Sequence, residues 1–299
     1  MKQQSEGQGG ARVARPSSSA RPRAWLGIVP FALFCLAFMI LPAGSLLVGS
    51  FQNAEGAFTL ANIAHLFRPD ILKCYLVTIE VSAVTAVAGG LFGLLLAFSV
   101  TLGGLPKGIR SGLLTFSGVA SNFAGVPLAF AFIATMGRVG MVTVVLKTVF
   151  GLNLYEHGFN LYSFWGLCLT YLYFQLPLMV LIITPALDGM KKEWREASES
   201  LGASKTQYWL HIGLPILAPP LLSCMILLFG NAFAAYATAY SLTAGSIPIV
   251  PNLISAYYTG NVLDNPHLAQ ALAFGMFVVL AGTMAIYIPL QRRSARWAK

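Results

Sequence analysis

Six long apolar runs dominate this sequence and decide its fold class. They cover approximately residues 26–48, 75–100, 113–135, 162–185, 216–240 and 266–290. A helix that crosses the hydrocarbon core of a bilayer needs about 20 apolar residues, because each residue rises only about 1.5 Å. The runs are continuously apolar rather than alternating, which favours helices over the strands of a membrane barrel. The sequence therefore predicts an all-α integral membrane protein with six transmembrane helices.

The distribution of Lys and Arg predicts the orientation of these helices. Fifteen of the 19 basic residues lie before the first run, between the second and third, between the fourth and fifth, or after the sixth. Basic loops stay preferentially in the cytoplasm. We therefore expect both termini to be cytoplasmic. This bias also accounts for the net charge of +9 without a nucleic-acid partner.

A polar segment, residues 186–215, separates the fourth and fifth runs and is expected to lie in water. One helical stripe in it is apolar and consists of Met190, Trp194, Ala197 and Leu201. Gly202 follows where the end of a helix needs a positive φ. Ser204 and Gln207 have the spacing of a capping box that opens a second helix. Pro215 favours a kink or a new helix start, and we place the return to the bilayer there.

Seven residues of this segment keep a characteristic spacing: Glu196, Ala197, Ser198, Gly202, Ile212, Leu214 and Pro215. The spacing resembles the EAA loop of permease subunits of type I, binding-protein-dependent ABC importers. In that family the loop is cytoplasmic and supplies a coupling helix that lodges in a groove of the ATP-binding subunit. The resemblance implies that Glu196 fixes this helix by hydrogen bonding, Ala197 permits close approach and Gly202 sets the turn. Ser198 stands where the family pattern has alanine.

The resemblance also implies the partners and the mechanism. In the family, two permease subunits pair in the bacterial inner membrane, two ATPase subunits dock on their EAA loops, and an external binding protein delivers the solute. The permease itself is not an enzyme and holds no cofactor or metal, because ATP and Mg²⁺ bind to the ATPase. The spermidine/putrescine branch is the most similar, so a polyamine or another small organic or inorganic ion is the favoured solute. The long basic N-terminal tail favours a heterodimeric permease pair.

The resemblance divides the chain into four parts. Residues 1–24 are expected to be a disordered basic cytoplasmic tail, and residues 25–70 the first transmembrane helix with an outer loop. Residues 71–290 resemble the transmembrane domain of the family and contain the EAA coupling loop, 186–215. Residues 291–299 form a basic cytoplasmic C-terminus.

Polar residues inside the apolar runs are the candidates for the translocation path. They are Glu80, Asn122, Gln175, Asn231 and Tyr236. Polar side chains in hydrocarbon find partners inside the helix bundle or beside a water-filled cavity. The alternative for each amide is a structural hydrogen bond between helices, and for Glu80 an interfacial carboxylate. A break that lines the path is also expected in the third run near Pro127.

Two other classes of function fit the sequence less well. A secondary transporter driven by an ion gradient is the alternative hypothesis, but such carriers usually have internal repeats and intramembrane acids, and Glu80 is the one candidate acid. A membrane enzyme lacks support, because the histidines are isolated and the catalytic motifs are missing. The four cysteines show no metal or redox spacing. The chain also has no phosphate-binding loop, so ATP hydrolysis must come from another polypeptide.

Overall fold

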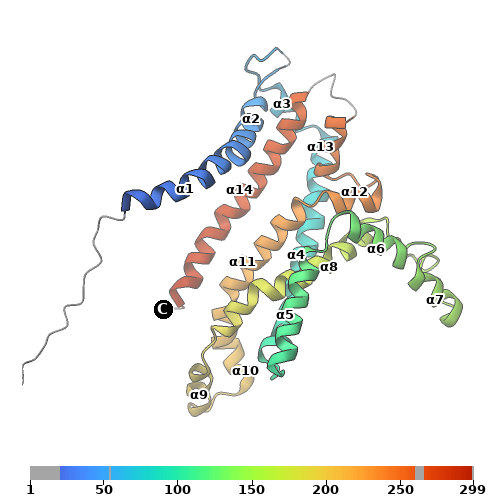
Figure 1. Ribbon diagram of the computed structural model, residues 1–299. Coiled ribbons are helices and arrows are strands. Elements are labelled where there is room, and N and C mark those ends of the chain that lie inside the picture. Colours follow the sequence, from blue (N-terminus) through green and yellow to red (C-terminus); the bar gives the residue numbers. More distant parts are fainter. Residues whose placement is uncertain (1–20, 54, 260–265, 298–299) are drawn as a thin grey trace, which may run out of the picture. The chain divides into compact units, whose positions relative to one another are not determined.

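The computed structural model describes residues 21–53, 55–259 and 266–297 (Figure 1). Regular structure in these ranges is helical, apart from an isolated bridge between Gln52 and Phe58. Six described segments are long and apolar enough to cross a membrane: Ile28–Gly49, Pro69–Leu102, Val126–Phe150, Phe164–Asp188, Lys205–Phe233 and His267–Pro289. The predicted all-α fold with six spans is therefore confirmed.

Residues up to Val48 form a unit that is described by itself. It contains α1 (Arg21–Cys35), a π-helical turn η2 (Leu36–Ile40) and most of α2 (Leu41–Gly49), which follow one another without a gap. The predicted tail spans residues 1–24. Residues 1–20 of it lie outside the described residues, and α1 begins at Arg21. A single apolar helix has no core of its own, so its side chains need lipid or neighbouring protein to cover them.

The second unit, from Gly49 onward, holds the remaining helices. They are α3 (Ala61–His65), α4 (Pro69–Leu102), α5 (Lys107–Asn122), α6 (Val126–Met136), α7 (Met141–Phe150), α8 (Phe164–Asp188), α9 (Lys192–Ser200), α10 (Lys205–Tyr208), the π-helical turn η3 (Trp209–Gly213), α11 (Leu214–Phe233), α12 (Ala237–Thr243), α13 (Val250–Thr259) and α14 (Pro266–Trp297). Helices α4, α8 and α11 form the centre of this unit, where each contacts the other two (Figure 1). α5 packs along α8, and α14 packs along α11.

Glycines allow α4 and α8 to approach closely. Gly89 and Gly93 lie one turn apart on α4 and are buried. A Cβ atom at Gly89 would lie 3.0 Å from the Cβ atom of Gln175, and one at Gly93 would lie 2.5 Å from that of Met179. Both distances are shorter than normal carbon contacts, so a side chain at Gly93 would force a shift and one at Gly89 would crowd Gln175; small residues of this kind are common where membrane helices meet. The contact fixes α8 against α4 and thereby positions the loop that follows α8.

The third predicted span, 113–135, is interrupted, which corrects the boundaries drawn from the sequence. α5 ends at Asn122 and α6 begins at Val126. Gly125 between them has φ 74° and ψ −147°, a conformation that is essentially restricted to glycine. Because of this interruption, the segment that meets the length and hydropathy requirements is Val126–Phe150. The break predicted near Pro127 is confirmed, with Pro127 in the first turn of α6.

The fifth predicted span, 216–240, also needs correction. The continuous segment begins earlier, at Lys205, and ends at Phe233. Residues 234–236 then leave the helical path, and α12 begins at Ala237. Phe233 before this interruption and Ala237 after it are apolar, so hydropathy alone could not locate it.

Candidate functional site

The loop at residues 186–215 folds as two short helices joined by a tight turn. α9 ends at Ser200, and Gly202 has a φ of 79°, which confirms the predicted positive φ. A Cβ atom at Gly202 would meet none of the described residues within 4 Å, so the backbone conformation is what demands glycine. The predicted capping box is also confirmed. Ser204 Oγ accepts a hydrogen bond from the Gln207 N–H at 3.3 Å, and Gln207 Oε1 accepts one from the Ser204 N–H at 2.8 Å.

The second half of the loop continues directly into a long helix. α10, η3 and α11 follow one another without a gap, and Leu214 and Pro215 lie exposed in the first turn of α11. Gly213 faces the ring of Trp209 so closely that a side chain at this position would collide with it. Trp209 also meets Phe98 of α4 edge to face, with ring centroids 5.1 Å apart. This aromatic contact anchors the returning helix on α4.

One surface of the loop is an apolar groove of about 480 Å³. We name it the loop groove, and it is lined by Trp194, Ala197, Ser198, Leu201, Ala203, Ile212 and Ile216. Leu201 is 88 % exposed, although leucine is among the most frequently buried residues. Ser198 is 4 % exposed, and its hydroxyl donates to the Arg195 carbonyl at 2.8 Å. Three members of the predicted apolar stripe therefore share this groove, and Met190 does not.

Met190 instead borders a second, more polar cavity of about 720 Å³. This cavity lies between the end of α4 and the helices α9 and α10, and its lining includes Phe98, Lys191, Lys192, Arg195, Glu196 and Trp209. The side chain of Glu196 is thus placed on the other face of α9 from the loop groove. The structure consequently places Ala197, Ser198 and Ile212 in the loop groove and Glu196 at the second cavity, whereas Gly202 forms the turn and Leu214 and Pro215 lie outside both linings.

The two interrupted helices are joined to each other. The Gly125 N–H donates a hydrogen bond to Thr238 Oγ1 at 2.7 Å, which links the start of α6 to α12. The Tyr171 hydroxyl of α8 donates to the Ala235 carbonyl at 2.6 Å, inside the second break. Thr238 was not among the predicted site residues. It is a polar residue in an apolar run, but nothing in the sequence places it opposite Gly125.

The five predicted path residues occupy different environments. Glu80 on α4 and Asn231 on α11 are exposed. Asn122 is exposed beside the first break, where its Nδ2 donates to the Gly118 carbonyl at 2.8 Å. The Tyr236 hydroxyl lies beside the second break, 2.7 Å from Ser255 Oγ. Among the residues that the structure describes, no hydrogen bond joins any two of the five.

Gln175, the remaining path candidate, lies in the packed centre. Its side chain is fully buried, and Nε2 donates to the Leu228 carbonyl at 3.1 Å and to Thr85 Oγ1 at 3.4 Å. These bonds connect α8 with α11 and α4. Oε1 is buried without a partner among the described residues. In this conformation Gln175 makes hydrogen bonds between helices. Such structural bonds are the alternative to a role in the translocation path.

Residues 89–296, more than half of the chain, match the family model described as binding-protein-dependent transport system inner membrane component. The chain belongs to this family. It is a multi-pass inner-membrane protein, the permease subunit of an ABC importer, and it is not an enzyme.

Curated relatives of this permease are named for the transport of different solutes. A probable sulfate transport system permease of Nephroselmis olivacea is 27% identical over 251 residues, covering 83% of this chain and 82% of its own. The sulfate transport system permease of Salmonella typhimurium is 23% identical, covering 96% and 98%. A spermidine/putrescine permease homologue of Mycoplasma pneumoniae is 27% identical but covers 42% of each chain.

Solved structures confirm the fold of the permease. A bacterial ABC transporter involved in the import of the acidic polysaccharide alginate matches with a TM-score of 0.68 and 16% identity, covering 93% of this chain and 98% of the other. A second structure of a bacterial alginate ABC transporter, in complex with an alginate pentasaccharide-bound periplasmic protein, matches with a TM-score of 0.64. At this level of identity the likeness extends to the fold and not to the solute.

The contact between the two breaks in the permease can be tested by replacing Thr238 with valine. The change keeps the shape of the side chain but leaves the Gly125 N–H without an acceptor in a site where Thr238 is 2 % exposed. An unsatisfied buried donor costs about 1–3 kcal/mol, so we expect a lower melting temperature in detergent. Thr238→Ser, which keeps the hydroxyl, is the matched control. Equal melting temperatures for the two variants would contradict a stabilising role for this bond.

Proposed function

We propose that this permease subunit pairs with a second, different permease subunit and is energised by two ATP-binding subunits that dock on residues 186–215. In this arrangement the ATPase binds ATP and Mg²⁺, and the permease holds no cofactor. The loop and both termini face the cytoplasm, and an external solute-binding protein delivers the solute. ATP-driven closure of the ATPase pair moves the coupling helix α9 and switches the path from inward-facing to outward-facing.

The observation that carries this proposal is the loop groove. An apolar groove of about 480 Å³ lies on a loop that is otherwise rich in charged side chains. Trp194 and Ala197 of α9 and Leu201 at its C-cap have the spacing of one helical face, which is the pattern with which a helix docks into the groove of a partner. Leu201, at 88 % exposure, is the most prominent apolar side chain of this face. An interface with another protein accounts for the exposure, because the same surface in water is unfavourable.

For the solute we propose a small hydrophilic cation, of the kind that includes polyamines. Among the described spans, Glu80 is the one acidic residue that lies away from a helix end, and its side chain is exposed. A carboxylate in the middle of a membrane costs about 2.5–3.5 kcal/mol on insertion scales, so such residues face water or a polar partner. We assign Glu80 to the water-filled path, where its charge attracts cations and repels oxyanions such as sulfate.

Replacing Glu80 with glutamine tests this assignment. We expect the uptake of spermidine into vesicles that contain the complete transporter to lose affinity about tenfold, because a charge-assisted contact worth about 1.5 kcal/mol is lost. Asp70→Asn is the matched control, since Asp70 lies on the same helix in an exposed ion pair with Arg68 at 3.2 Å. Uptake of sulfate but not spermidine by the wild type, or unchanged spermidine uptake by Glu80→Gln, would contradict a cationic solute.

The assembly itself is tested by mild detergent purification from the native membrane, followed by mass spectrometry. We expect an ATP-binding subunit and a second permease subunit to co-purify with the chain. Recovery of the chain alone in every detergent would favour the alternative of an ion-gradient-driven carrier. Recovery of an ATPase without a second permease sequence would indicate a homodimer.

A further inference from the structure

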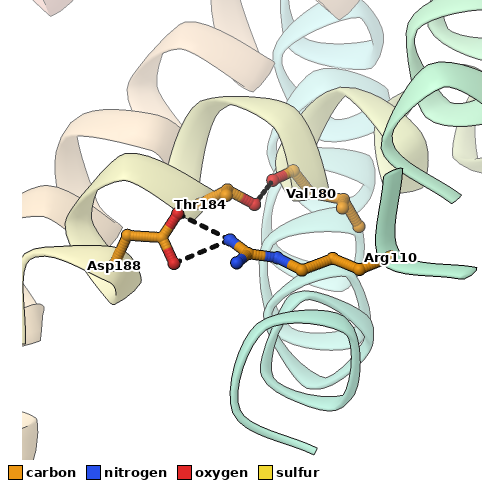
Figure 2. Close-up of polar contacts among 4 residues, drawn as sticks. All are labelled: Arg110, Val180, Thr184 and Asp188. Atoms are coloured by element: carbon orange, nitrogen blue, oxygen red, sulfur yellow. Dashed lines mark hydrogen bonds and ion pairs between the residues drawn. The ribbon is translucent and has the colours of Figure 1, made fainter. Parts of the chain in front are cut away.

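An ion pair links α5 to the end of α8, immediately before the loop (Figure 2). Arg110 Nη2 lies 2.7 Å from both carboxylate oxygens of Asp188. Arg110 stands near the N-terminus of α5, and Asp188 is the last residue of α8. Gly189, Met190 and Lys191 separate Asp188 from α9. The pair therefore lies where the base of the coupling loop meets a neighbouring helix.

The pair is unfavourably placed for both of its own helices. A helix N-terminus carries a partial positive charge, which disfavours Arg110 in α5. A helix C-terminus carries a partial negative charge, which disfavours Asp188 in α8. Neither charge helps its own helix, so the favourable interaction is the contact between the helices. This distinguishes the pair from the Arg195–Glu199 pair, which lies within α9.

The last turn of α8 is weakly held by its own helix. Pro185 has no N–H, so the Leu181 carbonyl lacks its usual helical donor. One residue earlier, the hydroxyl of Thr184 donates to the Val180 carbonyl at 2.5 Å, a bond that tends to bend helices (Figure 2). The final turn, which carries Asp188, is thus loosened from the helix above it and attached to α5 by Arg110.

The attachment has room for a second arrangement. Arg110 uses one nitrogen for both oxygens of Asp188, and its Nε is buried without a hydrogen-bond partner in the part of the chain that the structure describes. Arginine binds carboxylates more strongly through two nitrogens in parallel. An arrangement that used Nε as well as Nη2 would keep the ion pair with the last turn of α8 in a different position. Such an arrangement would let the link follow a movement of the loop.

The C-terminal end of α5 lies at the interruption of the third span, which a hydrogen bond connects to α12, just beyond the interruption of the fifth span. We call these two interruptions the joined breaks. α5 ends at Asn122, and after Gly125 the chain continues as α6. The Gly125 N–H is bound to Thr238 of α12, beyond the interruption of the fifth span. α5 consequently extends from the base of the loop to the point where the two broken helices meet.

We propose that Arg110 and Asp188 are positioning residues that transmit movement of the loop to α5 and, through it, to the joined breaks. This inference rests on the proposed function, because it assumes that an ATPase moves the loop. The pair holds the end of α8 on α5, so that a displacement of α9 displaces α5 as well. Without the pair, the loosened turn at Pro185 absorbs the displacement.

The first test uses the complete transporter with its ATPase and binding protein in proteoliposomes. For Arg110→Gln and Asp188→Asn we expect normal assembly and ATP hydrolysis, but at least a fivefold lower uptake of solute per ATP. The exchanged double variant, Arg110→Asp with Asp188→Arg, should recover at least half of the wild-type ratio of solute uptake to ATP hydrolysis. Arg68→Gln, which breaks the exposed pair with Asp70, is the control and should keep the ratio. An unchanged ratio in both single variants, or a parallel loss of assembly, hydrolysis and uptake, would overturn the proposal.

The second test needs no ATPase and so separates this inference from the proposed function. Spin labels at positions 107 and 192 report the distance between the start of α5 and the start of α9 in the permease chain alone, in nanodiscs. We expect one narrow distribution for the wild-type background and a clearly broader one with Arg110→Gln. An unchanged distribution would show that the pair does not hold the end of α8, whatever the ATPase experiments reveal. If the wild type binds no ATPase, the proposed function fails, and this measurement still decides the role of the pair.

Discussion

Replacing Leu201 with aspartate is expected to release the ATP-binding subunit from the purified transporter and to lower solute uptake at least tenfold. Leu201 is 88 % exposed and lines the loop groove with Trp194, Ala197 and Ile212. Aspartate at this position would bury an unpaired carboxylate when the partner docks, which costs several kcal/mol unless the charge finds a partner. Central apolar residues of an interface typically contribute about 2 kcal/mol or more, so the lost affinity exceeds tenfold. Co-purification and vesicle uptake measure the two effects.

The matched control for this change is Thr206→Asp. Thr206 is exposed in α10 on the same loop, outside the lining of the loop groove. An aspartate near a helix N-terminus is also favourable, so the control adds the same charge without disturbing the fold. Full retention of the ATPase by Leu201→Asp, or equal losses in both variants, would show that the groove is not the docking surface.

The local features of the loop could be predicted because their causes are local. Gly202 follows an apolar helical stripe, and a positive φ at the end of a helix depends on the residues beside it. The capping box of Ser204 and Gln207 joins residues three apart, so its signature is visible in the sequence. The apolar runs are equally direct evidence, because composition over about 20 residues decides whether a segment suits a membrane.

The interruptions in the third and fifth spans could be located only in part. Pro127 indicated the first break. Hydropathy could not locate the three residues that leave the helix, because the index is averaged over a longer window. The conformation of Gly125 is stabilised by Thr238, which lies 113 residues away in the sequence. The second break, at residues 234–236, has no proline or glycine to signal it. Contacts of this kind depend on how helices pack, which no single segment specifies.

The Arg110–Asp188 pair was missed for the same reason. The sequence placed both residues on the same side of the membrane, at the edges of polar connections, and this was the available signal. Their contact spans 78 residues and requires that α5 pack along α8 at a particular rotation. Gln175 shows the converse case. Its polarity within a run marked it for the path, whereas the packing of α4, α8 and α11 gives its amide nitrogen partners in the interior.

Replacing Gly202 with valine is expected to separate ATP hydrolysis from transport while leaving membrane insertion and ATPase binding in place. With φ at 79°, a β-branched residue is strained by about 1–3 kcal/mol, and the turn between α9 and α10 relieves that strain by changing its path. No atom of the described residues beyond its chain neighbours lies within 4 Å of a Cβ added at Gly202, so contact of this Cβ with another part of the structure does not contribute. The loop groove keeps its side chains, but the orientation of α9 relative to α10 changes. We expect uptake per ATP to fall about tenfold.

Gly56→Val provides the matched control for the strain itself. Gly56 also has φ 79°, and no atom of the described residues lies within 4 Å of an added Cβ, but it lies in the connection before α3, far along the chain from the loop. Normal transport by Gly202→Val would remove the turn from the coupling mechanism, and an equal loss in Gly56→Val would attribute the effect to general destabilisation. Leu201→Asp should release the ATPase, whereas Gly202→Val should retain it. The variants at these two neighbouring positions therefore distinguish binding of the ATPase from transmission of its movement to the permease. Transmission then depends on the geometry of the turn and on the attachment of α8 to α5, and not on the affinity of the groove alone.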